Sequence, residues 1–252
     1  MKVKILGTVS PYSNGSCNCP GYLVTNKQDR ILLDCGNGIS REMRMPEDLI
    51  NLTIIISHLH KDHYGELLSL GYASYVYNKL GYLDKRINVY IPNIENEDLM
   101  DYKYLNCFGE ENFFKFINYD ENDIIELSSS NITFCNSIHQ TKSFSIKVKD
   151  NKESLVYSGD TGYNNNKLEQ FAKDADLLIC ESTFLLNQKK DKDYHLCASE
   201  AALIAKKANV YKLLLTHFWP EIDKKEYLNE ALQIFGNTDV AIEGKELILK
   251  RI

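Results

Sequence analysis

The chain has 252 residues, and its apolar fraction of 44% is enough to form the core of one α/β domain over residues 1–252. It contains no stretch of about 18 apolar residues, which excludes a membrane-spanning helix. The net charge of −6 counts against a large polyanionic substrate, because proteins that grip long nucleic acids usually present a basic surface.

The N-terminal segment predicts a strand at residues 2–7, where lysines alternate with apolar residues before Gly7. A signal peptide would need an uninterrupted apolar stretch and a cleavage site of small residues, which this segment lacks. The seven cysteines form no Cys-x-x-Cys pair, and several adjoin apolar strands, as reduced thiols in a core do. These features predict a cytoplasmic protein.

Short apolar or alternating segments, separated by Gly, Asn and Asp turns, continue along the chain. Further strands are predicted at 21–25, 30–35, 52–56, 88–91, 113–118, 131–138, 143–148, 154–158, 176–180, 212–216, 239–242 and 246–250. Helices are predicted at 65–80, 167–173, 198–208 and 224–235. The mixture of buried strands and helices predicts an α/β fold.

Four potential metal ligands fall within six residues, His58-Leu59-His60-Lys61-Asp62-His63, just after the strand at 52–56. On a helix these positions would point in several directions, so we expect a loop on which the side chains converge. Such a loop lies where α/β sheets place their chemistry, at the carboxyl ends of strands. Imidazoles with one carboxylate suit zinc, and manganese or iron would be tolerated.

Other ligand-type residues also follow predicted strands: His139 follows 131–138, Asp160 follows 154–158, and His217 follows 212–216. His195 stands shortly before the helix at 198–208. A single histidine at a strand end is more often structural than catalytic. Their repeated occurrence at strand ends, together with the clustered motif, predicts a metal centre.

The order of these motifs resembles that of the metallo-β-lactamase superfamily over the whole chain. The matching segments are Leu33-Asp34-Cys35-Gly36, the His58–His63 motif, Ser137-Ile138-His139, Ser158-Gly159-Asp160-Thr161 and Thr216-His217-Phe218. The resemblance implies a four-layer αβ/βα sandwich with metals at one edge between the sheets. It implies that one Zn²⁺ is bound by His58, His60 and His139, a second Zn²⁺ by Asp62, His63 and His217, and both by Asp160.

A pair of such ions about 3.5–4 Å apart can share a hydroxide, bring the pKa of its parent water to about 7, and stabilise the attacking and leaving oxygens. Asp62 could orient that water or accept its proton. Mn²⁺ or Fe²⁺ could replace Zn²⁺.

Within the superfamily, the segments Glu181-Ser182-Thr183-Phe184 and Tyr194-His195-Leu196 resemble the ribonuclease Z-like branch. This resemblance implies that Glu181 and His195 cooperate next to a scissile phosphodiester. The carboxylate would keep the imidazole cationic, so that His195 stabilises charge or protonates the leaving oxygen.

Three features separate the chain from tRNA-processing members of that branch. About twenty residues lie between His139 and Asp160, too few for the tRNA-binding arm, and Trp219-Pro220-Glu221 replaces the usual Ser-x-Arg-Tyr. The acidic charge is the third. We therefore predict a two-zinc phosphodiesterase that acts on small or flexible phosphodiesters or short nucleic-acid ends and could form a homodimer.

Several alternatives stay open at the level of sequence. The chain could hydrolyse a lactone, thioester or β-lactam, could cut tRNA at its 3′ end, or could bind metal without turnover. Trp219 could stack on a base or pack in the core. The polar loop at residues 8–20 is expected to border the site, with no role assigned.

Overall fold

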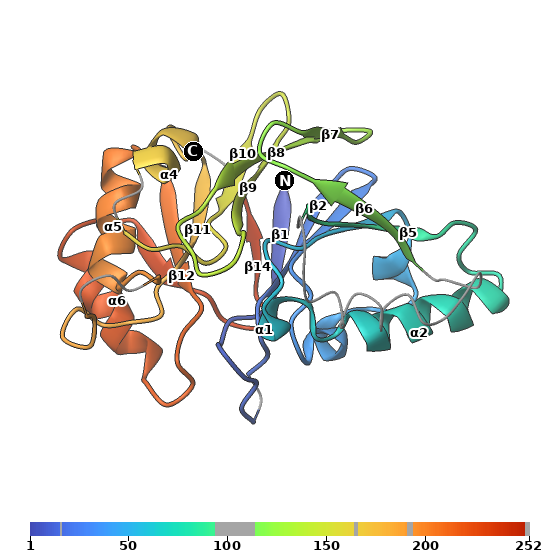
Figure 1. Cartoon of the computed structure of the whole chain (residues 1–252), viewed down its shortest axis with the longest axis horizontal. Helices are drawn as coiled ribbons and strands as arrows, with labels where there is room; N and C mark the ends of the chain where they lie inside the picture. The colour runs from blue at the N-terminus through green and yellow to red at the C-terminus, as the bar shows by residue number, and fades with distance from the viewer. Residues whose placement is uncertain (16, 94–113, 164–165, 191–193, 250–252) are drawn as a thin grey trace.

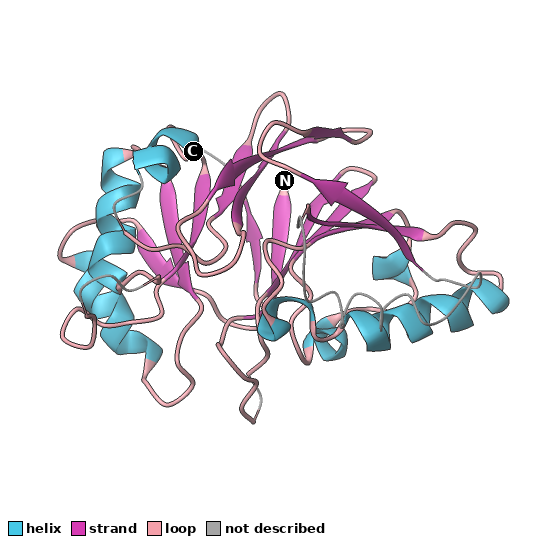
Figure 2. Cartoon of the chain, in the orientation of Figure 1, coloured by secondary structure: helices cyan, strands magenta, loops and turns pink. Residues whose placement is uncertain are grey.

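The structure, a computed structural model, describes residues 1–15, 17–93, 114–163, 166–190 and 194–249. Two seven-stranded sheets pack face to face, and helices cover the outer face of each sheet (Figure 1, Figure 2). This arrangement confirms the predicted four-layer αβ/βα sandwich. Among the described residues no helix has the length and apolar character needed to cross a membrane.

The first sheet has the strand order β14-β1-β2-β3-β4-β5-β6. Its antiparallel part comprises β14 (Glu246–Ile248), β1 (Lys2–Gly7), β2 (Gly21–Asn26) and β3 (Asp29–Leu33). From β3 onward the strands are parallel: β4 (Leu52–Ile55), β5 (Ile87–Pro92) and β6 (Phe114–Tyr119). Helix α2 (Leu67–Lys79) lies along the outer side of this sheet (Figure 2). Two short 3₁₀ turns, Ile39–Glu42 and Glu47–Leu49, come before it in the chain.

The second sheet has the order β13-β12-β11-β10-β9-β8-β7. Its antiparallel strands are β7 (Ile124–Glu126), β8 (Asn131–Asn136), β9 (Phe144–Lys149) and β10 (Ser154–Tyr157). Its parallel strands continue with β11 (Leu177–Glu181), β12 (Lys212–Thr216) and β13 (Thr238–Val240). The covering helices are α4 (Asn166–Phe171), α5 (Ala198–Lys207) and α6 (Lys224–Leu232).

The main core lies between the two sheets, where Val24 and Ile55 of the first sheet belong to the same buried cluster as Phe144 and Leu214 of the second. A second core lies under α5, which buries a face made largely of alanines. Small side chains on that face let the helix approach the sheet closely, and burial of apolar area from both elements stabilises the contact.

The sequence did not predict strand β7 or the two 3₁₀ turns, and one segment predicted as a loop is partly helical. Strand β7 was not predicted, because only one of its three residues is buried and the segment carries no periodic signal. The expectation that the whole motif at 58–63 is a loop is wrong for its second half, since Lys61–Tyr64 form one turn of helix, α1. The predicted first residue of the strand at 113–118 and the last of the strand at 246–250 lie outside the described residues.

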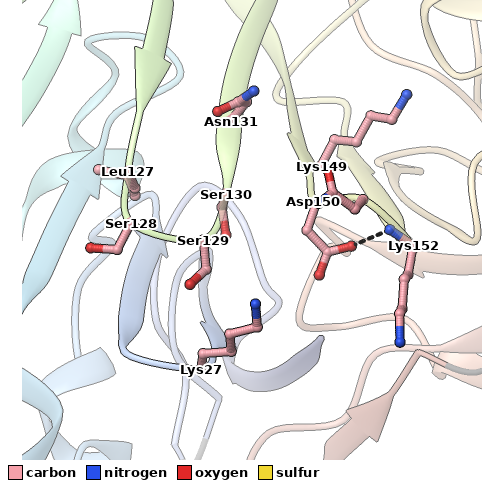
Figure 3. Close-up of a pocket in the computed structure, with 10 residues that line it drawn as sticks. Lys27, Leu127, Ser128, Ser129, Ser130, Asn131, Lys149, Asp150 and Lys152 are labelled. Atoms are coloured by element: carbon pink, nitrogen blue, oxygen red, sulfur yellow. Dashed lines mark hydrogen bonds between the residues drawn. The ribbon is translucent and has the colours of Figure 1, made fainter.

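A cavity of about 570 Å³ lies among the turns at the beginning of β8 and β10, lined by Lys27 and by residues 127–131 and 149–152 (Figure 3). These turns are at the opposite end of the strands from His139 and Asp160, which follow the same two strands. None of the predicted ligands lines this cavity, so the candidate centre is elsewhere.

Candidate metal centre

The predicted ligands meet at the carboxyl ends of the strands. The segment after β4 carries His58 and His60, and the helical turn α1 carries Asp62 and His63. The loops after β8, β10 and β12 carry the other three, which are His139, Asp160 and His217. All seven side chains therefore come together from four separate segments, because both sheets end at the same edge of the sandwich.

The first donor set consists of His58, His60, His139 and Asp160, whose potential ligand atoms all lie within 4.8 Å of one another. His60 Nδ1 is 3.0 Å from His58 Nε2 and 3.1 Å from His139 Nε2. In a tetrahedral zinc site with bonds of about 2.0–2.1 Å, neighbouring ligand atoms are about 3.3 Å apart. The nitrogens of the first set therefore fit one zinc ion.

The second donor set consists of Asp62, His63 and His217. His63 Nε2 is 3.2 Å from His217 Nε2, and Asp62 Oδ2 is 3.4 Å from His63 Nε2 and 3.6 Å from His217 Nε2. These separations are again those of ligands around one small cation. The structure thus brings together a second complete donor set beside the first.

The carboxylate of Asp160 faces both sets. Its Oδ2 is 3.5 Å from His58 Nε2, and its Oδ1 is 3.1 Å from His217 Nε2. Oδ1 is buried and has no hydrogen-bond partner among the residues that the structure describes. A buried carboxylate oxygen without a donor is costly, and a cation between the two sets would satisfy it.

Protein groups on the far side of the rings orient four of the imidazoles, and in His58 this group is the Ser57 hydroxyl, 3.1 Å from Nδ1. In His63, Nδ1 lies 2.7 Å from Asp34 Oδ2. In His217 it lies 2.8 Å from Thr183 Oγ1, and in His139 it lies 3.2 Å from the carbonyl oxygen of Tyr194. Each acceptor holds the proton on Nδ1, so that the Nε2 lone pair points into the centre.

Asp34 is a fully buried carboxylate that organises the base of the site. It accepts hydrogen bonds from the Ser57 amide and hydroxyl, at 2.6 and 2.8 Å, and from the Tyr157 hydroxyl at 2.7 Å, in addition to its contact with His63. Its φ of 58° places it in the left-handed region, which aspartate tolerates better than most residues. From the sequence, Asp34 is recognisable only as part of a family motif.

The electrostatics favour ligation. Burial and the neighbouring His63 hold the pKa of His58 well below its usual value, and burial also lowers the pKa of His60 and His139. Neutral imidazoles have the free lone pair that a metal requires. Burial favours the neutral form of His63, but the negative charges of Asp160, Asp62 and Asp34 have the larger effect. The pKa of His63 is therefore raised well above its usual value. A proton on His63 and a cation would therefore compete for the same group of carboxylates.

The predicted pair Glu181–His195 lies directly beside the centre. His195 Nδ1 is 3.0 Å from Glu181 Oε1, and the His195 ring stacks on His217 with ring centres 5.4 Å apart. Glu181 is held by the Thr161 and Leu196 amides at 2.8 and 3.1 Å. Burial tends to lower the pKa of His195, but the charge and hydrogen bond of Glu181 outweigh burial and raise that pKa to about 9.

Two hydroxyl groups were missed by the sequence analysis. Ser10, in the polar loop at residues 8–20, donates to Asp62 Oδ2 at 2.9 Å, which gives that loop a place in the site. Thr183 Oγ1 lies 2.8 Å from Glu181 Oε2 and 2.8 Å from His217 Nδ1. Both lie inside segments singled out from the sequence, the polar loop at residues 8–20 and Glu181–Phe184, but serine and threonine are too common for their roles to be assigned from the sequence.

Comparisons with known proteins extend along almost the whole chain. A family model described as beta-lactamase superfamily domain matches residues 29–218, which include all seven predicted ligands. The probable metallo-hydrolase YhfI of Bacillus subtilis is 28% identical over 248 residues, covering 97% of this chain and 98% of YhfI. The crystal structure of YhfI, aligned at 25% identity, superimposes with a TM-score of 0.84 and covers 98% of both chains.

Two further proteins are similar to this chain. Ribonuclease Z of Clostridium perfringens is 27% identical, covering 99% of this chain and 98% of that protein. The crystal structure of a diphosphatase from the PhnP family has a TM-score of 0.75 at 18% identity, covering 98% of this chain and 96% of the other, and so shares the fold.

Proposed function

The chain belongs to the β-lactamase superfamily, and from that membership we propose that it is a single-domain phosphodiesterase with two zinc ions. The relatives named metallo-hydrolase, ribonuclease and diphosphatase support hydrolysis, and two of these names refer to cleavage at phosphorus. The donor sets described above support two ions, with Asp160 as the shared ligand. When bound, the ions would lower the pKa of a water and withdraw charge from the phosphoryl oxygens.

The observation that carries phosphodiester specificity is the Glu181–His195 pair at 3.0 Å, beside the second donor set. The leaving alkoxide of a phosphodiester needs a proton, and the reacting phosphoryl group bears more negative charge than an ester carbonyl. Because Nδ1 of His195 faces Glu181, the proton on Nε2 is the one available to the leaving oxygen. Hydrolysis of a lactone or β-lactam does not require this second pair.

Asp62 is the proposed general base. Its carboxylate oxygen Oδ2 accepts a hydrogen bond from Ser10 and lies within 3.6 Å of His63 and His217. Burial would raise the pKa of Asp62, but the neighbouring imidazoles outweigh it and hold that pKa below its usual value, so the carboxylate is ionised. The Ser10 hydrogen bond fixes the orientation of the carboxylate.

A small or short substrate is supported by the segment between His139 and Asp160. That segment forms the antiparallel hairpin β9–β10, as its length predicted, and contains no inserted arm. Long RNA would lack a gripping element there, which disfavours tRNA 3′-end processing.

The experiment measures hydrolysis of four chromogenic substrates by the zinc-loaded chain: bis-p-nitrophenyl phosphate, a lactone, a thioester and nitrocefin. We expect the phosphate diester to be hydrolysed and the activity to be abolished in Asp62→Ala. For a diester with an alkoxide leaving group, His195→Gln should lower turnover about 10²–10⁴-fold, the range for loss of a general acid. Turnover of bis-p-nitrophenyl phosphate should fall much less, because p-nitrophenolate leaves without a proton, and zinc content should stay at two equivalents. Turnover of the lactone or thioester alone would refute the proposal.

A further inference from the structure

A path of aromatic rings runs from the centre to the protein surface. His195 stacks on His217, and the Phe184 ring meets His195 nearly perpendicularly with centres 6.2 Å apart. The Trp219 ring then meets Phe184 at 5.2 Å and 84°. Trp219 is thus one ring removed from the imidazole that would protonate the leaving oxygen.

Trp219 is not a core residue, because 37% of it is exposed. Since its ring is nearly perpendicular to Phe184, that contact covers at most one face of the indole. Tyr194, next to His195 in the chain, is 42% exposed, and its ring lies 6.4 Å from that of His139. Exposed aromatic side chains grouped beside a catalytic centre are a feature of binding surfaces.

The backbone that carries Trp219 is fixed by the polar loop. The Ser10 amide donates to the Phe218 carbonyl at 2.9 Å, and the Phe218 amide donates to the Thr8 carbonyl at 3.0 Å. The Tyr12 hydroxyl donates to Glu221, two residues after Trp219. The fixed backbone and the contact with Phe184 limit the freedom of the indole, so that stacking of a ligand on it costs little further conformational entropy.

Resting on the proposed phosphodiesterase activity, we propose that Trp219, supported by Phe184, stacks on a nucleobase, and that the substrates are nucleoside phosphodiesters. Base stacking requires a planar π face rather than charge. In a chain with a net charge of −6, little affinity can come from a broad basic surface, so stacking would have to supply much of it.

The test uses two diesters with the same leaving group, thymidine 5′-(p-nitrophenyl phosphate) and methyl p-nitrophenyl phosphate, and the zinc-loaded full chain. Trp219→Leu should lower kcat/KM for the thymidine ester about 5- to 150-fold, chiefly through KM, and leave the methyl ester unchanged. Trp219→Phe keeps a ring and should retain part of the preference. The matched control is Tyr211→Leu, since Tyr211 is 41% exposed and lies before β12, at the strand end remote from the centre.

Trp219 is the sole tryptophan, so its fluorescence reports directly on the proposed contact. Thymidine 5′-monophosphate should quench it, whereas ribose 5-phosphate should not. Equal effects of Trp219→Leu on both esters, or an unchanged thymidine preference without quenching, would overturn the stacking and leave the phosphodiesterase activity standing. Failure of the wild-type chain to hydrolyse either ester would overturn the proposed function and the stacking proposal with it.

Discussion

Replacement of Thr183 by valine tests whether the residues behind the ligands hold the centre together. The Thr183 hydroxyl donates to Glu181 Oε2 and accepts from His217 Nδ1, both at 2.8 Å. Valine has nearly the same shape as threonine but can neither donate nor accept a hydrogen bond. His217 would lose the partner that keeps its proton on Nδ1 and its lone pair on Nε2.

The size of the effect can be worked out from burial. Thr183, Glu181 and His217 are all buried, so water cannot readily replace the lost hydroxyl. An unsatisfied buried polar group costs about 1–3 kcal/mol. Loss of an outer partner of a metal ligand typically weakens metal binding about 10–100-fold, which agrees with that cost. In the proposed two-zinc centre, we expect this weakening for the ion at Asp62, His63 and His217, and none for the ion at the first donor set.

A competition titration with a chromophoric zinc chelator would measure both affinities in wild type, Thr183→Val and Thr183→Ser. The serine variant keeps the hydroxyl and should bind both zinc ions as the wild type does. If Thr183→Val also held two equivalents with unchanged affinity, the hydroxyl would have no part in positioning His217, and the reasoning would be wrong.

Other perturbations address the shared ligand, the buried carboxylate, the metal as a whole and the orientation of the base. Asp160→Ala should leave at most one equivalent of zinc by elemental analysis, because Asp160 faces both donor sets; two retained equivalents would contradict a shared ligand. Asp34→Asn should lower zinc affinity at the donor set containing His63 about 10–100-fold, since an amide cannot accept all the hydrogen bonds that Asp34 receives. Circular dichroism would show that the variant is folded, and an unchanged zinc affinity would count against a role of Asp34 in positioning His63. Zinc at about 100 times its Kd should raise the free energy of unfolding by ~2.7 kcal/mol. Calorimetry should then show a higher unfolding temperature with zinc than with a chelator, and equal unfolding temperatures would argue against a zinc site in the folded chain. Ser10→Ala should slow turnover about tenfold with zinc content unchanged, whereas loss of zinc would mean that Ser10 supports ligation rather than the base.

Much of the fold could be predicted from local pattern, because buried strands such as β4 and β12 are apolar on both faces and the alanine-rich α5 has strong helix propensity. Strand β7 escaped prediction because it is short and mostly exposed. The helical turn α1 escaped because four ligands in six residues suggested a loop, and the structure divides them instead between an extended segment and one helical turn.

The candidate metal ligands could be identified from the sequence alone, since histidine and aspartate at the ends of strands are few and chemically distinctive. The resemblance to the superfamily also implied how these side chains divide into two donor sets, whereas the groups that orient them became visible only in the folded chain. Ser10 meets Asp62 and Thr183 meets His217 across long stretches of chain. A hydroxyl acquires such a role only from the distance and direction of its partner, and these are set by the packing of the two sheets, which no local pattern encodes.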